Sequence, residues 1–160
     1  MLLLSALIAS TIACVLLATP AFANDSPHGR TCAAKTKGLY GFHCHGSAFN
    51  GVAFDQVTLV GTVHGDGRGF YEGFGTFNSD QGSASTHLAG QATFGPNCLG
   101  RVVYTTNEIL LPGGGTIPLP PATFDFIAVD DSNEILGAGV APGMTGDAVP
   151  RLVCRLVRVR

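Results

Sequence analysis

Two histidines flank a cysteine at His43-Cys44-His45, and their types and spacing suit metal chemistry. Alternate residues of a β-strand point to the same face, so both imidazoles would be open to one ion. His87 lies in a later strand-like segment and is the candidate third ligand. A metal site needs a complete ligand set, and polar strand residues facing solvent or an interior would give the same pattern. His43, His45 and His87 are therefore candidate metal ligands, while the sequence predicts no resident cofactor.

A carboxylate with possible acid–base chemistry, Glu72, lies between Phe70 and Phe74. If Glu72 pointed inward, an aromatic wall would favour its protonated form and suit it to proton transfer. An outward glutamate on a half-exposed strand is the commoner arrangement. The chain has no Gly-x-Ser-x-Gly, phosphate-binding loop or His-Glu-x-x-His motif. Several classes of hydrolase and nucleotide-binding protein are thereby excluded.

The elements that would position these residues are β-strands. The stretch from Val57 to Phe77 is predicted to form a hairpin, because Asp66-Gly67 separates two extended runs and a tight turn favours glycine. Turn residues divide the rest of the chain into similar runs, and glycines within them allow a sheet to coil shut. The eight predicted strands are 38–47, 56–64, 69–77, 83–94, 99–110, 123–129, 134–140 and 150–159. We expect an all-β, closed, eight-stranded antiparallel up-and-down barrel.

One long connection, residues 111–122, contains four prolines and three glycines. We expect no strand there, because proline cannot donate to a ladder and glycine weakens one. A loop of this length either closes over a barrel mouth as a lid or is a permissive insertion. The sequence leaves both alternatives open.

The N-terminal segment is typical of an export signal. Residues 2–18 are almost wholly apolar, and Ala21-Phe22-Ala23 offers small residues at the positions that a signal peptidase reads. We expect residues 1–23 to be a cleaved signal peptide, with an uncleaved membrane anchor as the alternative. Residues 24–37 then form a polar, flexible lead-in and residues 38–160 one barrel domain. The expected location is secreted or periplasmic, without membrane contact after cleavage.

The charge balance bears on the partners of the protein. The chain has nine basic and eleven acidic residues, and its net charge is −2. Without a strong field of either sign, it is not expected to bind nucleic acid or an anionic membrane. The sequence does not predict an oligomeric state.

Four cysteines, Cys32, Cys44, Cys98 and Cys154, follow the signal segment, and no Cys-x-x-Cys motif is present. An even number in an exported chain predicts two disulfides. In a closed meander the first and last strands pair antiparallel, which makes Cys44 and Cys154 neighbours across the seam. The lead-in and the turn after the fourth strand lie at the same barrel end, which brings Cys32 near Cys98. We therefore predict the pairs Cys44–Cys154 and Cys32–Cys98.

Four segments carry a family resemblance: Gly-Leu-Tyr-Gly-Phe at 38–42, Val-Gly-Thr-Val-His-Gly-Asp-Gly-Arg-Gly at 60–69, Gly-Gln-Ala-Thr-Phe-Gly-Pro-Asn-Cys-Leu-Gly at 90–100 and Phe-Asp-Phe-Ile-Ala-Val-Asp-Asp at 124–131. In these segments the chain resembles small exported bacterial proteins that are similar to the allene oxide cyclase-like, broadly lipocalin-like barrels. The resemblance implies a barrel. It consists of turns and glycines, so it brings no catalytic motif and assigns no functional residue.

An eight-stranded barrel is just wide enough to hold one small ligand or to be filled by its own side chains. Aromatic side chains would supply an apolar wall, and glycines would leave room for a ligand. The expected pocket residues are Phe42, Phe54, Phe70, Glu72, Phe74, Phe94, Phe124 and Phe126. We expect a protein that binds a small lipophilic ligand. An isomerase or cyclase using the same pocket, and a solid barrel with a structural or interaction role, remain as alternatives.

Overall fold

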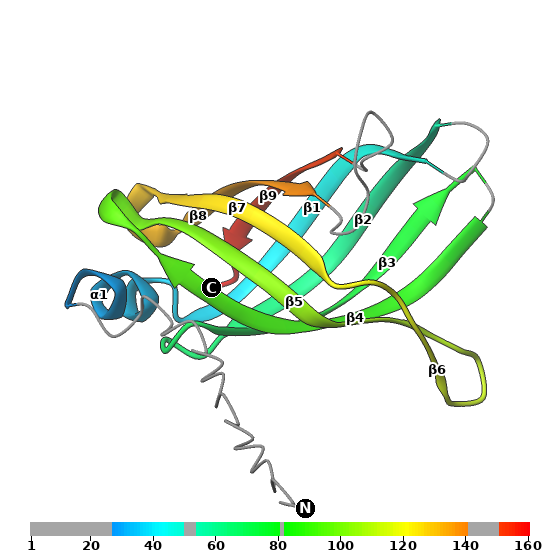
Figure 1. Cartoon of the computed structure of the whole chain (residues 1–160), viewed down its shortest axis with the longest axis horizontal. Helices are drawn as coiled ribbons and strands as arrows, with labels where there is room; N and C mark the ends of the chain where they lie inside the picture. The colour runs from blue at the N-terminus through cyan, green and yellow to red at the C-terminus, as the bar shows by residue number, and fades with distance from the viewer. Residues whose placement is uncertain (1–26, 50–53, 81, 141–150) are drawn as a thin grey trace, which may run out of the picture.

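The computed structural model describes residues 27–49, 54–80, 82–140 and 151–160, and it is built almost entirely of antiparallel strands (Figure 1). The predicted signal peptide, residues 1–23, lies outside this part of the chain. The strands are β1 (Gly38–Phe49), β2 (Phe54–Gly65), β3 (Phe70–Ser79), β4 (Gly82–Phe94), β5 (Leu99–Leu110), β6 (Thr116–Pro118), β7 (Ala122–Val129), β8 (Glu134–Val140) and β9 (Arg151–Arg158). The helical elements are α1 (Pro27–Lys35) and the 3₁₀ turns Pro96–Cys98 and Asp130–Ser132.

Eight of the strands form a closed barrel. Their order is β4-β3-β2-β1-β9-β8-β7-β5, and a further pairing of β4 with β5 joins the two ends of the sheet. Every pairing is antiparallel. The predicted fold class is confirmed. Closure leaves these strands without a free edge, because each finds a hydrogen-bonding partner on both sides.

The seam between β1 and β9 follows the predicted register closely. Tyr40 lies opposite Arg158 and Cys44 lies directly opposite Cys154. The structure contains both predicted disulfides, Cys44–Cys154 and Cys32–Cys98. Both cysteines of the seam are buried inside the barrel, at 4 % exposure each. Two disulfides indicate an oxidising environment outside the cytoplasm, since reduced thiols prevail inside it.

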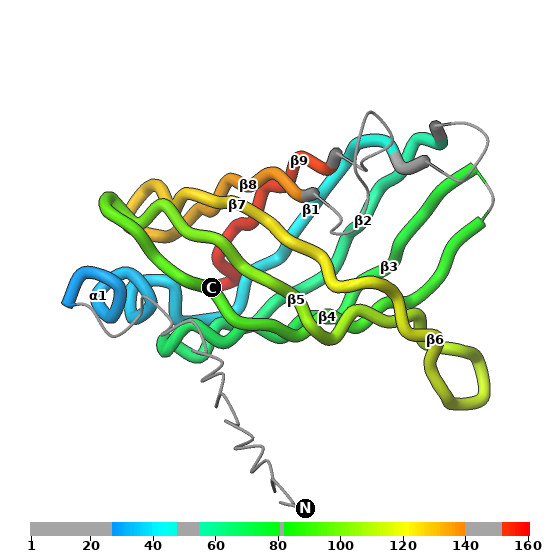
Figure 2. The backbone as a smooth tube through the Cα atoms, viewed as in Figure 1, coloured from blue at the N-terminus to red at the C-terminus, as the bar shows by residue number. Residues whose placement is uncertain are grey.

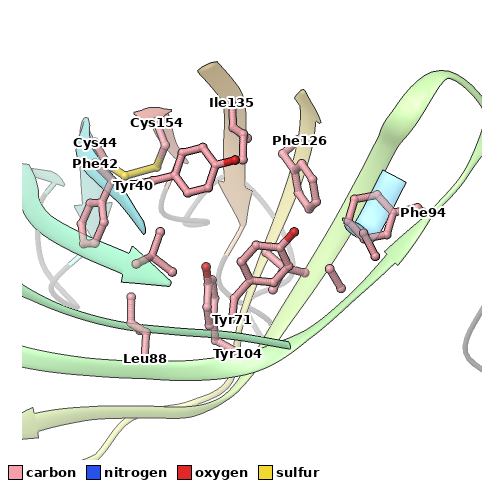
Figure 3. Packing of buried hydrophobic residues seen from close by; sticks show 14 of the residues in the cluster. Tyr40, Phe42, Cys44, Tyr71, Leu88, Phe94, Tyr104, Phe126, Ile135 and Cys154 are labelled. Carbon is pink, nitrogen blue, oxygen red and sulfur yellow. A yellow bond between two sulfur atoms is a disulfide. The ribbon is translucent and has the colours of Figure 1, made fainter. Parts of the chain in front are cut away.

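The core is the interior of the barrel, and strand alternation decides which side chains enter it. On β4, Leu88 and Phe94 point into the interior (Figure 3), and Ala92 of the same strand is also buried. Two glycines, Gly61 and Gly75, lie opposite each other on β2 and β3. A Cβ atom on either would approach the Phe42 ring to within 2.9 Å. Their missing side chains therefore leave the space that the Phe42 ring occupies.

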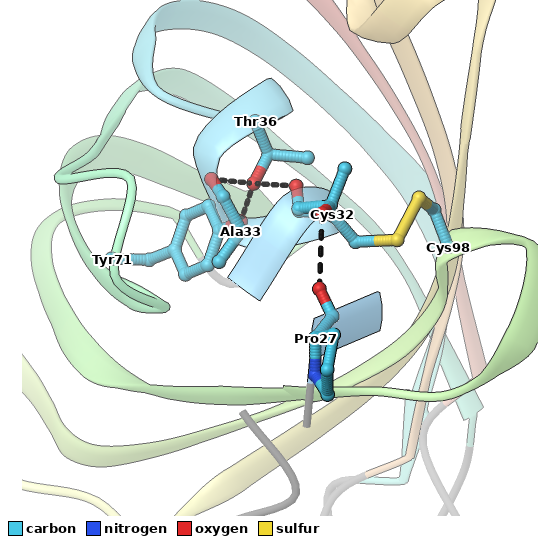
Figure 4. The surroundings of a disulfide bond; sticks show 7 residues. Pro27, Cys32, Ala33, Thr36, Tyr71 and Cys98 are labelled. Carbon is cyan, nitrogen blue, oxygen red and sulfur yellow. Dashed lines mark hydrogen bonds between the residues drawn. A yellow bond between two sulfur atoms is a disulfide. The ribbon is translucent and has the colours of Figure 1, made fainter. Parts of the chain in front are cut away.

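The described part of the predicted lead-in, residues 24–37, contains the helix α1, which the sequence did not lead us to expect. α1 lies at one end of the barrel, where its Ala33 and the following Thr36 are both 1 % exposed (Figure 4). The disulfide Cys32–Cys98 ties the helix to the turn between β4 and β5. A helix this short is marginal in water by itself, so packing and the disulfide must stabilise it. Among the described residues, no helix has the length and hydropathy of a membrane span.

The connection at 111–122 also differs from the expectation, because it contains the short strand β6. β6 pairs with the end of β5, from Glu108 to Leu110, beyond the part of β5 that pairs with β7. The tight turn between them uses three successive glycines with positive φ, from Gly113 to Gly115. The resulting ribbon extends away from the barrel wall instead of entering the interior (Figure 2).

Candidate functional site

A cavity of about 60 Å³ lies inside the barrel, and all eight barrel strands contribute to its wall. None of the lining residues is charged. The lining consists of Phe42, Cys44, Leu59, Val63, Tyr71, Gly73, Leu88, Val102, Tyr104, Phe124, Phe126, Ile135, Gly137, Cys154 and Leu156. An apolar concave site of this kind favours the binding of uncharged, lipophilic molecules.

Four of the predicted pocket phenylalanines lie inside the barrel. Phe42, Phe124 and Phe126 line the cavity. Phe94 is 3 % exposed and packs edge-on against Phe126, with ring centroids 5.5 Å apart. The side chain of Phe54 lies outside what the structure describes.

The three predicted pocket residues of β3 lie on the outer surface, so their assignment is corrected. Phe70 and Phe74 are 40 % and 53 % exposed, and Glu72 is also exposed. Successive residues of a strand alternate between its faces, and on β3 the inward positions belong to Tyr71 and Gly73. Aromatic residue type favoured an inward orientation for Phe70 and Phe74, but the alternation of β3 turns both outward.

Two further tyrosines that the sequence reasoning did not single out have partners for their hydroxyl groups. Tyr71 is hydrogen-bonded to the Thr36 hydroxyl at the end covered by α1 (Figure 4). The Tyr40 hydroxyl donates to the carbonyl of Ser132 at 2.8 Å and accepts from Arg158 at 2.7 Å. Burial raises the pKa of both phenols, and Arg158 partly offsets this effect at Tyr40. Both therefore stay protonated at neutral pH.

Tyr104 on β5 is the third interior tyrosine, and it was also missed. Its ring points into the barrel (Figure 3). The ring contacts Phe124 edge-on, with centroids 5.9 Å apart. Its hydroxyl makes no hydrogen bond within the part of the chain that the structure describes. Burial, and secondarily the nearby Tyr71 phenol, raise the pKa of Tyr104. Tyr104 therefore keeps a protonated hydroxyl, which is a hydrogen-bond donor.

The candidate metal ligands do not come together. His43 and His45 are exposed on the outer face of β1, with ring centroids 5.9 Å apart. The register runs from His43 through Val60 and Thr76 to Ser85, so His87 on β4 is separated from β1 by two strands. Adjacent strands are about 4.8 Å apart, so no single ion reaches all three imidazoles. Among the described residues no group of three His, Cys, Asp or Glu side chains is placed to hold a metal.

His87 instead bridges two carboxylates on the outer wall. Its Nδ1 lies 2.8 Å from Glu108 of β5, and its Nε2 lies 3.0 Å from Glu72 of β3. The Phe74 ring stacks on the imidazole at 4.5 Å. The hydrogen bond with Glu108, and then that with Glu72, raise the pKa of His87 despite its partial burial. The His87 and Thr116 side chains lower the pKa of Glu108. This network links three barrel strands to the start of β6.

The cavity lining differs from the outer wall in its ionisable groups. No carboxylate, imidazole or ammonium group lines the cavity, so no general base faces a guest there. Glu72, the predicted acid–base candidate, is on the opposite side of the wall. Comparison with protein-family models, curated protein sequences and solved structures finds no match for the chain.

Proposed function

We propose that this protein binds a small lipophilic molecule inside its barrel. The observation that supports the proposal is the interior cavity, whose lining has no charged side chain. Transfer of apolar surface from water into such a site is favourable by about 25 cal/mol per Å². Export to an extracellular or periplasmic space is part of the proposal, since the two disulfides suit an oxidising compartment.

The volume of the cavity limits the guest. An engineered protein cavity of about 150 Å³ holds benzene, so a cavity of about 60 Å³ suits a smaller molecule or the end of a longer one. The proposed resemblance to allene oxide cyclase-like barrels carries no functional residue and does not identify the guest. An isomerase or cyclase activity is a weaker candidate, because the residues that line the cavity include no carboxylate, imidazole or ammonium group that could act as a general base.

Titration with dissolved 2-methylpropene tests the proposal. We expect the methyl NMR signals of Leu88 and Ile135, on opposite walls of the cavity, to shift in a saturable manner. The matched control is Val102→Leu, which adds a carbon to the wall and should weaken binding by reducing the space. Unshifted methyl signals at saturating hydrocarbon would favour the solid barrel instead. Native mass spectrometry of protein from its own host would then identify the natural guest.

A further inference from the structure

The Tyr104 hydroxyl distinguishes the interior from a purely apolar cavity. Two of the residues that line the cavity carry a hydroxyl group, Tyr71 and Tyr104. The Tyr71 hydroxyl is bonded to Thr36, whereas that of Tyr104 has no hydrogen-bond partner among the described residues. Buried hydroxyl groups in native proteins are nearly always hydrogen-bonded, and an exception calls for an explanation such as a ligand or a water molecule.

The alternation of β5 directs Tyr104 into the cavity, on the face that also holds Gly100 and Val102. The ladder between β4 and β5 shifts register between Ala89 and Gly90, so that Tyr104 pairs with Gly90 while Thr106 pairs with Ala89. A Cβ atom on Gly90 would lie 2.6 Å from the Tyr104 Cα atom, so only glycine permits this close approach. The close approach of Gly90 and the edge-on contact with Phe124 pack the ring in this position.

From these observations we infer that the guest is a small, uncharged molecule with one acceptor oxygen, such as a ketone, aldehyde or ether, and that Tyr104 donates a hydrogen bond to that oxygen. The inference rests on the proposed function and specifies the chemical class of its ligand. Tyr104 thereby acts as the specificity-determining residue of the cavity.

The same surroundings exclude other classes of guest. Tyr104 remains protonated because burial raises its pKa, so it offers a donor at any physiological pH. A carboxylate in the cavity would be an uncompensated buried charge, since no cationic side chain lines the wall. A guest with several polar groups would leave most of them without partners, which costs about 1–3 kcal/mol for each group.

Two isosteric probes test the inference. Acetone and 2-methylpropene have nearly the same shape and differ by an oxygen in place of a methylene group. We expect acetone to bind the native protein about tenfold more tightly, which corresponds to about 1.4 kcal/mol, after correction for the different hydration of the two probes in water. In Tyr104→Phe this preference should disappear, while the affinity for 2-methylpropene should stay within about twofold. Acetate, which has the size of acetone and a negative charge, should not bind.

The outcomes separate this inference from the proposed function. If the native protein and Tyr104→Phe show the same corrected preference, Tyr104 is not the recognition group and its hydroxyl serves a bound water, although the barrel still binds guests. Acetate binding would overturn the requirement for an uncharged guest. If neither acetone nor 2-methylpropene binds, both this inference and the proposed function fail. A thermal melt of Tyr104→Phe, in which only a hydroxyl is removed, verifies that the variant folds.

Discussion

Removing one hydroxyl from each of two buried tyrosines should change stability in opposite directions. Tyr71→Phe and Tyr104→Phe delete the same atom from rings that are 5 % and 9 % exposed. Tyr71 loses its bond with Thr36, whose hydroxyl retains the carbonyls of Cys32 and Ala33 as acceptors. One hydrogen bond without an orphaned partner costs about 1 kcal/mol.

Tyr104→Phe removes a hydroxyl that has no described partner. Desolvating such a group costs about 1–3 kcal/mol in the folded state, so its removal should raise the free energy of unfolding by about 1 kcal/mol. The two variants should therefore differ by about 2 kcal/mol, with Tyr104→Phe the more stable. For a domain of this size that difference corresponds to roughly 8 °C in Tm.

Urea denaturation of ligand-free protein measures both variants against the native chain. Equal m-values would show that the unfolded states are comparable. If Tyr104→Phe loses as much stability as Tyr71→Phe, its hydroxyl is satisfied in the ligand-free protein. The argument for a free donor in the cavity would then be refuted.

Three other predictions follow from the seam, the outer wall and a turn. Replacing Cys44 and Cys154 by alanine should lower the free energy of unfolding by about 4–5 kcal/mol, because the disulfide closes a separation of 110 residues; a loss below about 1 kcal/mol in urea would contradict this loop-closure estimate. The raised pKa of His87 should stabilise the fold fully below pH 6.5, and this stabilisation should be lost as pH rises through the folded-state pKa. The lowered pKa of Glu108 should stabilise the fold above pH 4.5, and this stabilisation should be lost as pH falls through the folded-state pKa. His87→Gln should flatten the alkaline side of the stability–pH profile measured by denaturation, and an unchanged profile would show that the network is not coupled to folding. At Asp131, where φ is 50°, glycine should give a protein about 1 kcal/mol more stable than alanine, and the reverse order in thermal melts would argue against strain at this turn.

The barrel could be predicted because its information is local and repeated. Period-two alternation and turn glycines mark each strand, and consecutive strands joined by short turns pair antiparallel. Once closure is assumed, Cys44 and Cys154 can be matched from strand order alone. The helix α1 could not be predicted in this way. Its nine residues have no apolar periodicity, and distant elements hold it in place, through the disulfide from Cys32 to Cys98 and the bond of Tyr71 to Thr36 just after the helix.

The interior site was predictable in part, and the errors have two physical causes. Phe70 and Phe74 were placed inside because aromatic residues are usually buried, although the alternation of β3 gives its interior positions to Tyr71 and Gly73. The inward orientation of Tyr104 follows the alternation of β5 with Gly100 and Val102, whereas the surroundings of its hydroxyl depend on how the strands pair. The contact between His87 and Glu108 likewise depends on the β4–β5 register. Such cross-strand facts do not appear in the pattern of a single segment.

The seam has a consequence for how the molecule assembles. β1 and β9 come from opposite ends of the barrel sequence, so a ribosome releases the unpaired backbone edge of β1 long before its partner exists. Closing such a distant contact is slow, and an open strand edge invites pairing with other chains. During that interval Cys44 is also free to oxidise with the nearby Cys32, a mispairing that isomerisation must undo. Yield on refolding should therefore fall steeply with protein concentration, and the lifetime of the open edge, more than the stability of the finished barrel, should decide how much chain aggregates.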